Sequence, residues 1–204
     1  MNRVVDIRGP NGSGKTWVVR QLIAAATKVT ELRGPVFCDP EDTKPTDVWG
    51  IRLDGLLADG SPVYAVGPYD ELPTGGCDRI YRQETVTDRV RYLARHGSVV
   101  FEGVITGMTF GRYGELAREL KAAGAWYGVL VLDTPMSVCI ERVKARRAAR
   151  GTEEEGFNVA LMEEKAHRIE AIVLKFADQG TEVRWGGLPE LKAMLQPEQG
   201  VLGL

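Results

Sequence analysis

The residues most able to do chemistry lie near the N-terminus, in the run Gly9-Pro10-Asn11-Gly12-Ser13-Gly14-Lys15-Thr16. This run matches the pattern G-x-x-x-x-G-K-[ST] at every fixed position, with an apolar strand predicted before it and a helix after it. Glycines let backbone N–H groups turn inward around a polyphosphate, and the start of the helix adds partial positive charge. In such a loop the Lys15 ammonium reaches the β- and γ-phosphates and the Thr16 hydroxyl binds Mg²⁺. The predicted nucleotide ligands are Asn11, Gly12, Ser13, Gly14, Lys15 and Thr16.

Loops of this kind occur in kinases, GTPases and mechanical ATPases, so other features must separate these classes. A GTPase needs a guanine-reading N-K-x-D motif, and the chain contains none. It also has no D-x-x-G sequence after a predicted strand and no ABC-type signature. With 204 residues, the chain is too short for the usual module of an oligomeric ATPase. The sequence therefore favours a kinase that uses ATP.

Three acidic residues are candidates for binding the metal or for accepting a proton from an acceptor hydroxyl. Glu102 ends the apolar run 98–101, where a carboxylate can hold Mg²⁺ directly or through water. Asp39 follows the apolar run 36–38, and Asp78 follows two glycines in a long loop. Aspartate is also common in turns, so the residues alone do not decide which of the three acts as the base.

Strand ends must position these groups. Continuous apolar runs predict strands at 3–8, 36–38, 98–103, 127–133 and 181–185. Helical spacing of apolar residues predicts helices at 17–28, 83–96, 113–123, 135–150, 157–178 and 188–195. This alternation predicts a parallel sheet covered on both faces, with ligands bound beyond the carboxyl ends of its strands. The glycine-rich loop, Asp39, Glu102 and Asp133 would then meet at one edge.

Composition sets outer limits on the protein class. The length fits one domain with room for a lid or an insertion. A net charge of −2, from 26 basic and 28 acidic residues, excludes a chain that is basic throughout but allows a basic patch. The three cysteines form no C-x-x-C pair, which disfavours structural zinc and a disulfide framework. No run approaches about 18 apolar residues and no signal peptide is visible, so we expect no membrane span.

The segment 132–147 resembles the strand and pre-lid helix of small P-loop kinases, the nucleoside and nucleoside monophosphate kinase group. In that group, two arginines one helical turn apart precede a mobile lid, and Arg142 and Arg146 match them. The resemblance implies that Arg142 stacks on the adenine of ATP and that Arg146 contacts the phosphates. It also implies that Arg147 or Arg150 stabilises charge on the transferring group.

The same resemblance implies a P-loop NTPase architecture: a three-layer α/β/α sandwich with a mainly five-stranded parallel sheet, a lid and a small hairpin insertion. The strands 48–53 and 62–66 would form the hairpin. We expect a single domain over 1–204, with an acceptor-binding insertion at about 39–97 and a lid at about 147–157. Related kinases often carry an acid at the position of Asp39 that activates the acceptor hydroxyl.

A second resemblance concerns the acceptor. Residues 63–69, 75–78 and 100–103 do not match nucleoside monophosphate kinases and look like a group of bacteriophage P-loop kinases. Some of these phosphorylate the hydroxymethyl group of 5-hydroxymethyluracil within DNA, a step in thymidine hypermodification. The resemblance implies an ATP-dependent phosphotransferase acting on such DNA in the cytoplasm of a bacterial host. The alternatives are a kinase of a free nucleoside or nucleoside monophosphate, and a regulatory ATPase without an acceptor.

Charge is segregated along the chain in a way that allows a DNA acceptor. Residues 79–95 hold five arginines against two acidic residues, and 142–150 hold five basic residues and no acidic one. Residues 39–59 hold six acidic residues against two basic ones, so a DNA backbone would have to avoid them. A target base must leave the stack to reach the glycine-rich loop. The candidate stacking residues are Trp49, Tyr64, Tyr69 and Tyr81.

Overall fold

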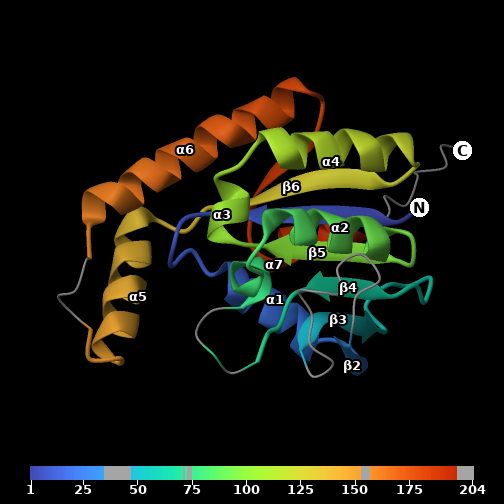
Figure 1. Ribbon diagram of the computed structural model, residues 1–204, viewed down its shortest axis with the longest axis horizontal. Coiled ribbons are helices and arrows are strands. Elements are labelled where there is room, and N and C mark those ends of the chain that lie inside the picture. The colour runs from blue at the N-terminus through green and yellow to red at the C-terminus, as the bar shows by residue number, and fades with distance from the viewer. Residues whose placement is uncertain (35–46, 71, 73–74, 153–156, 197–204) are drawn as a thin grey trace, which may run out of the picture.

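The fold was analysed in a computed structural model, which describes residues 1–34, 47–70, 72, 75–152 and 157–196. Seven strands form one sheet in the order β2-β3-β4-β5-β1-β6-β7 (Figure 1). The strands are β1 (Arg3–Arg8), β2 (Lys28–Arg33), β3 (Val48–Asp54), β4 (Val63–Val66), β5 (Ser98–Glu102), β6 (Trp126–Leu132) and β7 (Glu182–Gly186). The helices are α1 (Lys15–Ala24), α2 (Gln83–Ala94), α3 (Val104–Gly107), α4 (Gly111–Ala122), α5 (Met136–Ala148), α6 (Val159–Asp178) and α7 (Leu188–Leu195), with a 3₁₀ turn η1 (Gly76–Arg79).

Five neighbouring strands, from β4 to β7 in sheet order, run parallel, and this confirms the predicted α/β class. Figure 1 shows helices on both faces of the sheet. One apolar cluster joins the sheet to α2, α4 and α6, and a second joins its other face to α1 and α7. Strand β1 is buried along its whole length, as expected for a central parallel strand.

The hairpin is more closely integrated than the sequence suggested. Strands β3 and β4 pair antiparallel, as predicted, but β4 also pairs parallel with β5 and so belongs to the main sheet. The predicted strand 36–38 lies outside the described residues. The predicted helix 17–28 ends early, at Ala24, and Lys28–Arg33 form the edge strand β2 against β3. Tertiary pairing with β3 outweighs the helical spacing there, helped by the β-branched pair Val29 and Thr30.

A buried ion pair closes the carboxyl end of β1. The Arg8 guanidinium donates to Asp6 Oδ2 at 2.6 and 2.9 Å and to the Gly107 carbonyl at 2.9 Å. It also lies 4.5 Å from the ring centre of Phe176 in α6, and the Tyr127 hydroxyl donates to Asp6 Oδ2 at 3.0 Å. Burial raises the pKa of Asp6, while the positive charge of Arg8 opposes that rise. The pair therefore joins β1 to β6, α3 and α6.

We predict that Arg8→Leu lowers the free energy of unfolding by about 3–5 kcal/mol, because it leaves the Asp6 carboxylate buried without its cation. Urea denaturation measures this loss. The double variant Asp6→Asn/Arg8→Leu should lose less, since no charge is then left unpaired. A double variant no more stable than Arg8→Leu alone would contradict this account.

Candidate active site

A cleft of about 250 Å³ lies at the carboxyl ends of the central strands. It is lined by Asn11, Gly12, Gly14, Lys15, Thr16, Trp17, Arg20, Asp78, Glu102, Val104, Arg142 and Arg146. Nine of the predicted site residues are therefore brought together. Ser13 is buried and does not line the cleft, and Asp39 lies outside the described residues. Asp133 is exposed just after β6 and does not line it either.

The glycine-rich loop is packed directly against α5. Gly12 has a φ of 82°, a backbone angle that residues with a side chain rarely adopt. A Cβ atom at this position would also strike the backbone carbonyl of Cys139. Arg142 donates to the Gly12 carbonyl at 3.2 Å, and the Thr134 hydroxyl donates to the Ser13 carbonyl at 2.8 Å. The loop and the first turns of α5 thus form one packed unit.

Lys15 opens α1 and is buried, with 5 % of its surface exposed. Its Nζ atom donates to the carbonyls of Gly9 at 2.8 Å and Pro10 at 3.1 Å. Burial lowers the pKa of Lys15, while the negative charges of Glu102 and Asp78 oppose that lowering. The ammonium therefore lies within electrostatic reach of both carboxylates.

Glu102 and Thr16 bring two side-chain oxygen atoms together in the cleft. Glu102 lies opposite Ile7 in the register of β5 and β1, next to the root of the loop. The Thr16 hydroxyl donates to Glu102 Oε1 at 2.9 Å, and the buried Oε2 atom has no hydrogen-bond partner within the described residues. Such oxygens fit Mg²⁺, which usually takes one or two protein ligands together with phosphate oxygens and water. In the described ranges, no group of three or more His, Cys, Asp and Glu side chains could hold a metal by itself.

The electrostatics of Glu102 are unusual for a carboxyl group. Burial raises the pKa of Glu102 to about 7; Asp78 adds to this rise, and Lys15 and the Thr16 hydroxyl oppose it. Without a bound metal ion, the Glu102 carboxyl is thus about half protonated at neutral pH. A divalent ion at this position would favour the ionised form and displace the proton.

Asp78 reaches the same cleft from η1. Its Oδ1 atom accepts the Val104 N–H at 2.7 Å, at the start of α3, a short helix that the sequence did not predict. Gly76 allows the turn to approach β5 closely, because a Cβ atom there would lie 2.6 Å from Glu102 Oε1. Asp78 and Glu102 therefore lie on neighbouring elements and face the same space.

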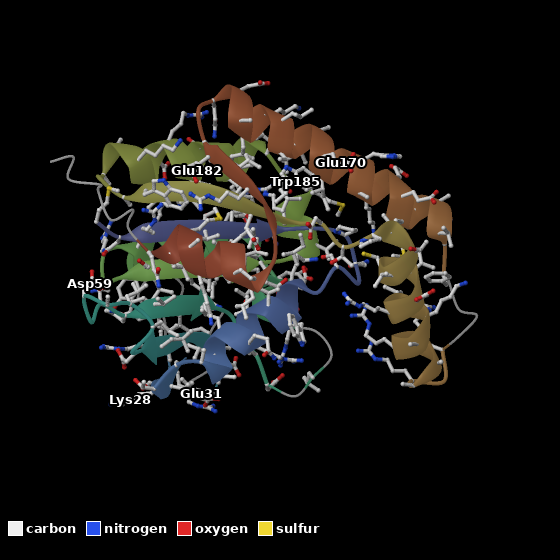
Figure 2. The ribbon with its side chains drawn as sticks, turned by 180° about the vertical axis from the view of Figure 1, so that it is seen from behind. Lys28, Glu31, Asp59, Glu170, Glu182 and Trp185 are labelled. Atoms are coloured by element: carbon white, nitrogen blue, oxygen red, sulfur yellow. The ribbon has the colours of Figure 1, made fainter. Side chains whose placement is uncertain are left out.

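The arginines of α5 divide between two sides of the helix. Arg142 and Arg146 line the cleft, whereas the Arg147 guanidinium lies 5.9 Å from the ring centre of Phe157. Burial and the charges of Arg150 and Arg147 lower the pKa of Arg146, so these cations repel one another. Figure 2 shows nitrogen-bearing side chains extending from α5 toward α1 and the glycine-rich loop. Such crowding of cations at a cleft suits an anionic ligand.

Sequence reasoning missed three residues of this cleft: Val104, whose N–H binds Asp78, Arg20 and Trp17. Arg20 lies four residues after Thr16 on α1, and that spacing could have placed it on the same helix face. Its guanidinium donates to the carbonyls of Asp70 and Leu72, which ties the loop after β4 to α1. Trp17, also at the cleft, is 59 % exposed, and no pattern in the sequence singles it out.

Comparison with known proteins assigns the family. The chain is 31 % identical over 199 residues to the 5-hmdU DNA kinase of Pseudomonas phage PaMx11, covering 95 % of this chain and 97 % of that protein. The chain belongs to the family of 5-hmdU DNA kinases. A second member, from Pseudomonas phage M6, is 27 % identical and matches 95 % of this chain and 98 % of its own length. The predicted resemblance to phage kinases is thereby confirmed.

Other comparisons add less about the family member described here. The chain matches no known protein-family profile. Among solved structures, the tunicamycin resistance protein of Deinococcus radiodurans aligns with 96 % of this chain and 94 % of its own, at a TM-score of 0.44 and 16 % identity. A likeness of this size indicates no function for the chain. No helix in the described part of the chain is long and apolar enough to cross a membrane.

We predict that Glu102→Gln changes how stability depends on pH in the absence of Mg²⁺ and nucleotide. The folded state holds the Glu102 proton more tightly than the unfolded state, whose pKa is near 4.5, so wild-type stability falls as pH rises from about 4.5 to about 7. The variant lacks this loss. Its free energy of unfolding relative to wild type should therefore rise by on the order of 3 kcal/mol between pH 4 and pH 8.

Denaturation at several pH values, with Glu170→Gln on the exposed face of α6 as the control, measures this difference. A constant difference between Glu102→Gln and wild type across the range would show that Glu102 is not held in a proton-retaining site.

Proposed function

We propose that this chain transfers the γ-phosphoryl group of ATP to the hydroxymethyl oxygen of 5-hydroxymethyluracil in DNA, in the cytoplasm of a phage-infected bacterium. The observation that carries the proposal is its relationship, over nearly the whole chain, to phage proteins named 5-hmdU DNA kinase. The cleft agrees with it, since Lys15, Thr16 and Glu102 supply a cation and two oxygen ligands at one strand edge.

The phosphates of ATP would lie against the loop 9–16, with Lys15 and Arg146 on the γ-phosphate and Arg142 beside the adenine. Thr16 and Glu102 would hold Mg²⁺, which neutralises charge that develops on the phosphate oxygens. Backbone N–H groups of the loop would contribute to the same stabilisation.

In the transfer step, the hydroxymethyl oxygen of the base forms a bond to the γ-phosphorus. The bond between that phosphorus and the β–γ bridging oxygen breaks, and ADP leaves. The proton of the hydroxyl passes to a carboxylate. Asp78, which lines the cleft, is the first candidate, and Asp39 is the second. Because phosphoryl transfer needs little covalent help, orienting the hydroxyl is the main task of this carboxylate.

The two remaining segments have separate roles in this proposal. Residues 39–97 form the acceptor side of one domain, and 147–157 act as a lid whose closure excludes water from the transfer. The exposed arginines next to the cleft, Arg79 and Arg82 of the stretch 79–95 together with those of 142–150, would carry the DNA backbone. The rest of the stretch 79–95 does not extend this surface, because Arg89 is buried and Arg91 and Arg95 lie beside Asn2 at the other end of α2.

A single assay tests the acceptor. Radiolabelled γ-phosphate from ATP is offered with DNA containing 5-hydroxymethyluracil, with ordinary DNA, and with free nucleosides and nucleotides. We expect label only in the modified DNA, and none with Lys15→Ala, whose fold is checked by circular dichroism. Label that enters only free nucleosides or nucleotides would overturn the DNA acceptor. ATP hydrolysis without transfer to any acceptor would indicate a regulatory ATPase instead.

A second prediction concerns Asp78. Asp78→Asn should lower kcat by about 10²-fold or more, as loss of a proton-accepting or orienting group does, and change the KM for ATP little. Steady-state kinetics with saturating modified DNA separate the two parameters. Asp178→Asn, at the exposed end of α6 and outside the cleft, is the control. An unchanged kcat would reduce Asp78 to a structural partner of the Val104 N–H.

A further inference from the structure

A second cavity, of about 480 Å³, lies beside the catalytic cleft on its acceptor side. Its walls come from β2, β3, the loop after β4, η1 and the start of α2, and include Trp49, Tyr69, Asp70, Arg79, Ile80 and Tyr81. Gly76 lies between Tyr69 of the cavity wall and Glu102 of the cleft. A Cβ atom on this glycine would lie 2.8 Å from Tyr69 Oη in the cavity wall and 2.6 Å from Glu102 Oε1 in the cleft. A group bound in the cavity is therefore next to the carboxylates.

The charges are balanced among the described residues of the cavity wall. These residues include three acidic and three basic side chains: Glu31, Asp47, Asp70, Arg33, Arg79 and Arg89. Two ion pairs already join members of this set, Arg33 with Glu31 and Arg79 with Asp70, each at 2.6 Å. Such a wall offers no excess of positive charge to a phosphate, and it suits a neutral, polar group. An uncharged pyrimidine base has that chemistry, whereas a nucleoside monophosphate would bring its phosphate with it.

Two polar atoms of the wall lack hydrogen bonds. Trp49 Nε1 and Tyr69 Oη are buried and have no hydrogen-bond partner within the described ranges. Burial raises the pKa of Tyr69, so its hydroxyl remains a donor at all ordinary pH values. Unpartnered buried donors are unfavourable for folding and are often found where a ligand completes them.

Tyr81 stands at the rim of this cavity with 91 % of its surface exposed. The backbone on both sides is held in place: Ile80 is buried and its N–H donates to the Cys77 carbonyl, and Gln83 accepts the Tyr113 hydroxyl at 2.6 Å. Arg79 and Arg82 flank the aromatic ring in sequence. A projecting ring on a fixed backbone, between two cations, suits insertion into a stack of bases beside a phosphate backbone.

We infer that the cavity receives the target pyrimidine after it leaves the DNA stack, and that the Tyr81 ring fills the space it vacates. The inference rests on the proposed function. It assigns the four candidate aromatic residues to different places: Tyr69 and Trp49 to the base pocket, Tyr81 to the duplex and Tyr64 to the core. Tyr64 is 6 % exposed in β4 and does not line the cavity.

The test compares duplex and single-stranded DNA that carry the same 5-hydroxymethyluracil. Tyr81→Ala should lower kcat/KM on the duplex about tenfold, because a stacking aromatic no longer offsets the unpairing of the base. On the single strand, where no base pair must open, the change should stay below about threefold. Tyr81→Phe keeps the ring and should behave as wild type on both. Trp185→Ala, an exposed aromatic on β7, is the control.

The pocket has its own variant. Tyr69→Phe removes only the unpartnered hydroxyl, so it should raise the KM for modified DNA about tenfold, leave the KM for ATP unchanged and not lower the melting temperature. Tyr64→Phe is the matched control.

If Tyr81→Ala lowers kcat/KM equally on duplex and single strand, or on neither, the insertion of Tyr81 into the duplex is overturned. An unchanged KM for DNA in Tyr69→Phe overturns the pocket. These outcomes differ from failure of the proposed function, in which the wild-type protein itself labels no DNA.

Discussion

The buried contact between Arg8 and Asp6 is the constraint on which the active edge of the sheet depends. Arg8 is the last residue of β1, so its fixed guanidinium determines where the glycine-rich loop begins. If this guanidinium turned away to another partner, the Asp6 carboxylate would be left charged in the core without its cation. Through the Gly107 carbonyl it also fixes α3, whose first N–H holds Asp78. A pair outside the cleft thus positions both the glycine-rich loop and Asp78.

From this edge the molecule divides into two sides with different chemistry. On one side the loop 9–16 and α5 bring several cations to the cleft, a setting for an anionic group. On the other, the walls near β3 and η1 carry paired charges and aromatic rings, a setting for a neutral group. Glu102 lies at the junction. Burial and the charge of Asp78 raise the pKa of Glu102 to about 7, while the charge of Lys15 opposes that rise.

Much of this arrangement could be predicted from the sequence because its signals are local. The glycine pattern and the continuous apolar runs depend on neighbouring residues, so the loop, the parallel strands and the position of Glu102 followed from them. Strand β2 could not be predicted, because its stability comes from pairing with β3 rather than from its own residues. The contact of Asp78 with Val104 and the tie of Arg20 to the loop after β4 were also hidden, since each joins residues at least 26 positions apart. The structure brings nine of the predicted site residues to one cleft, but the role of each of them remains a prediction, as do the roles of Ser13 and Asp39.

The absence of a side chain at Gly12 has a consequence for how such enzymes can diversify. The loop packs on the backbone of α5 at Cys139, so the two parts that would bind a nucleotide constrain one another and form one block. The acceptor walls come from a different stretch of chain, between β2 and α2, which approaches β5 at Gly76 and is tied to α1 through Arg20. New acceptors could thus be acquired by replacing this stretch alone, while the block that would bind the nucleotide stays intact.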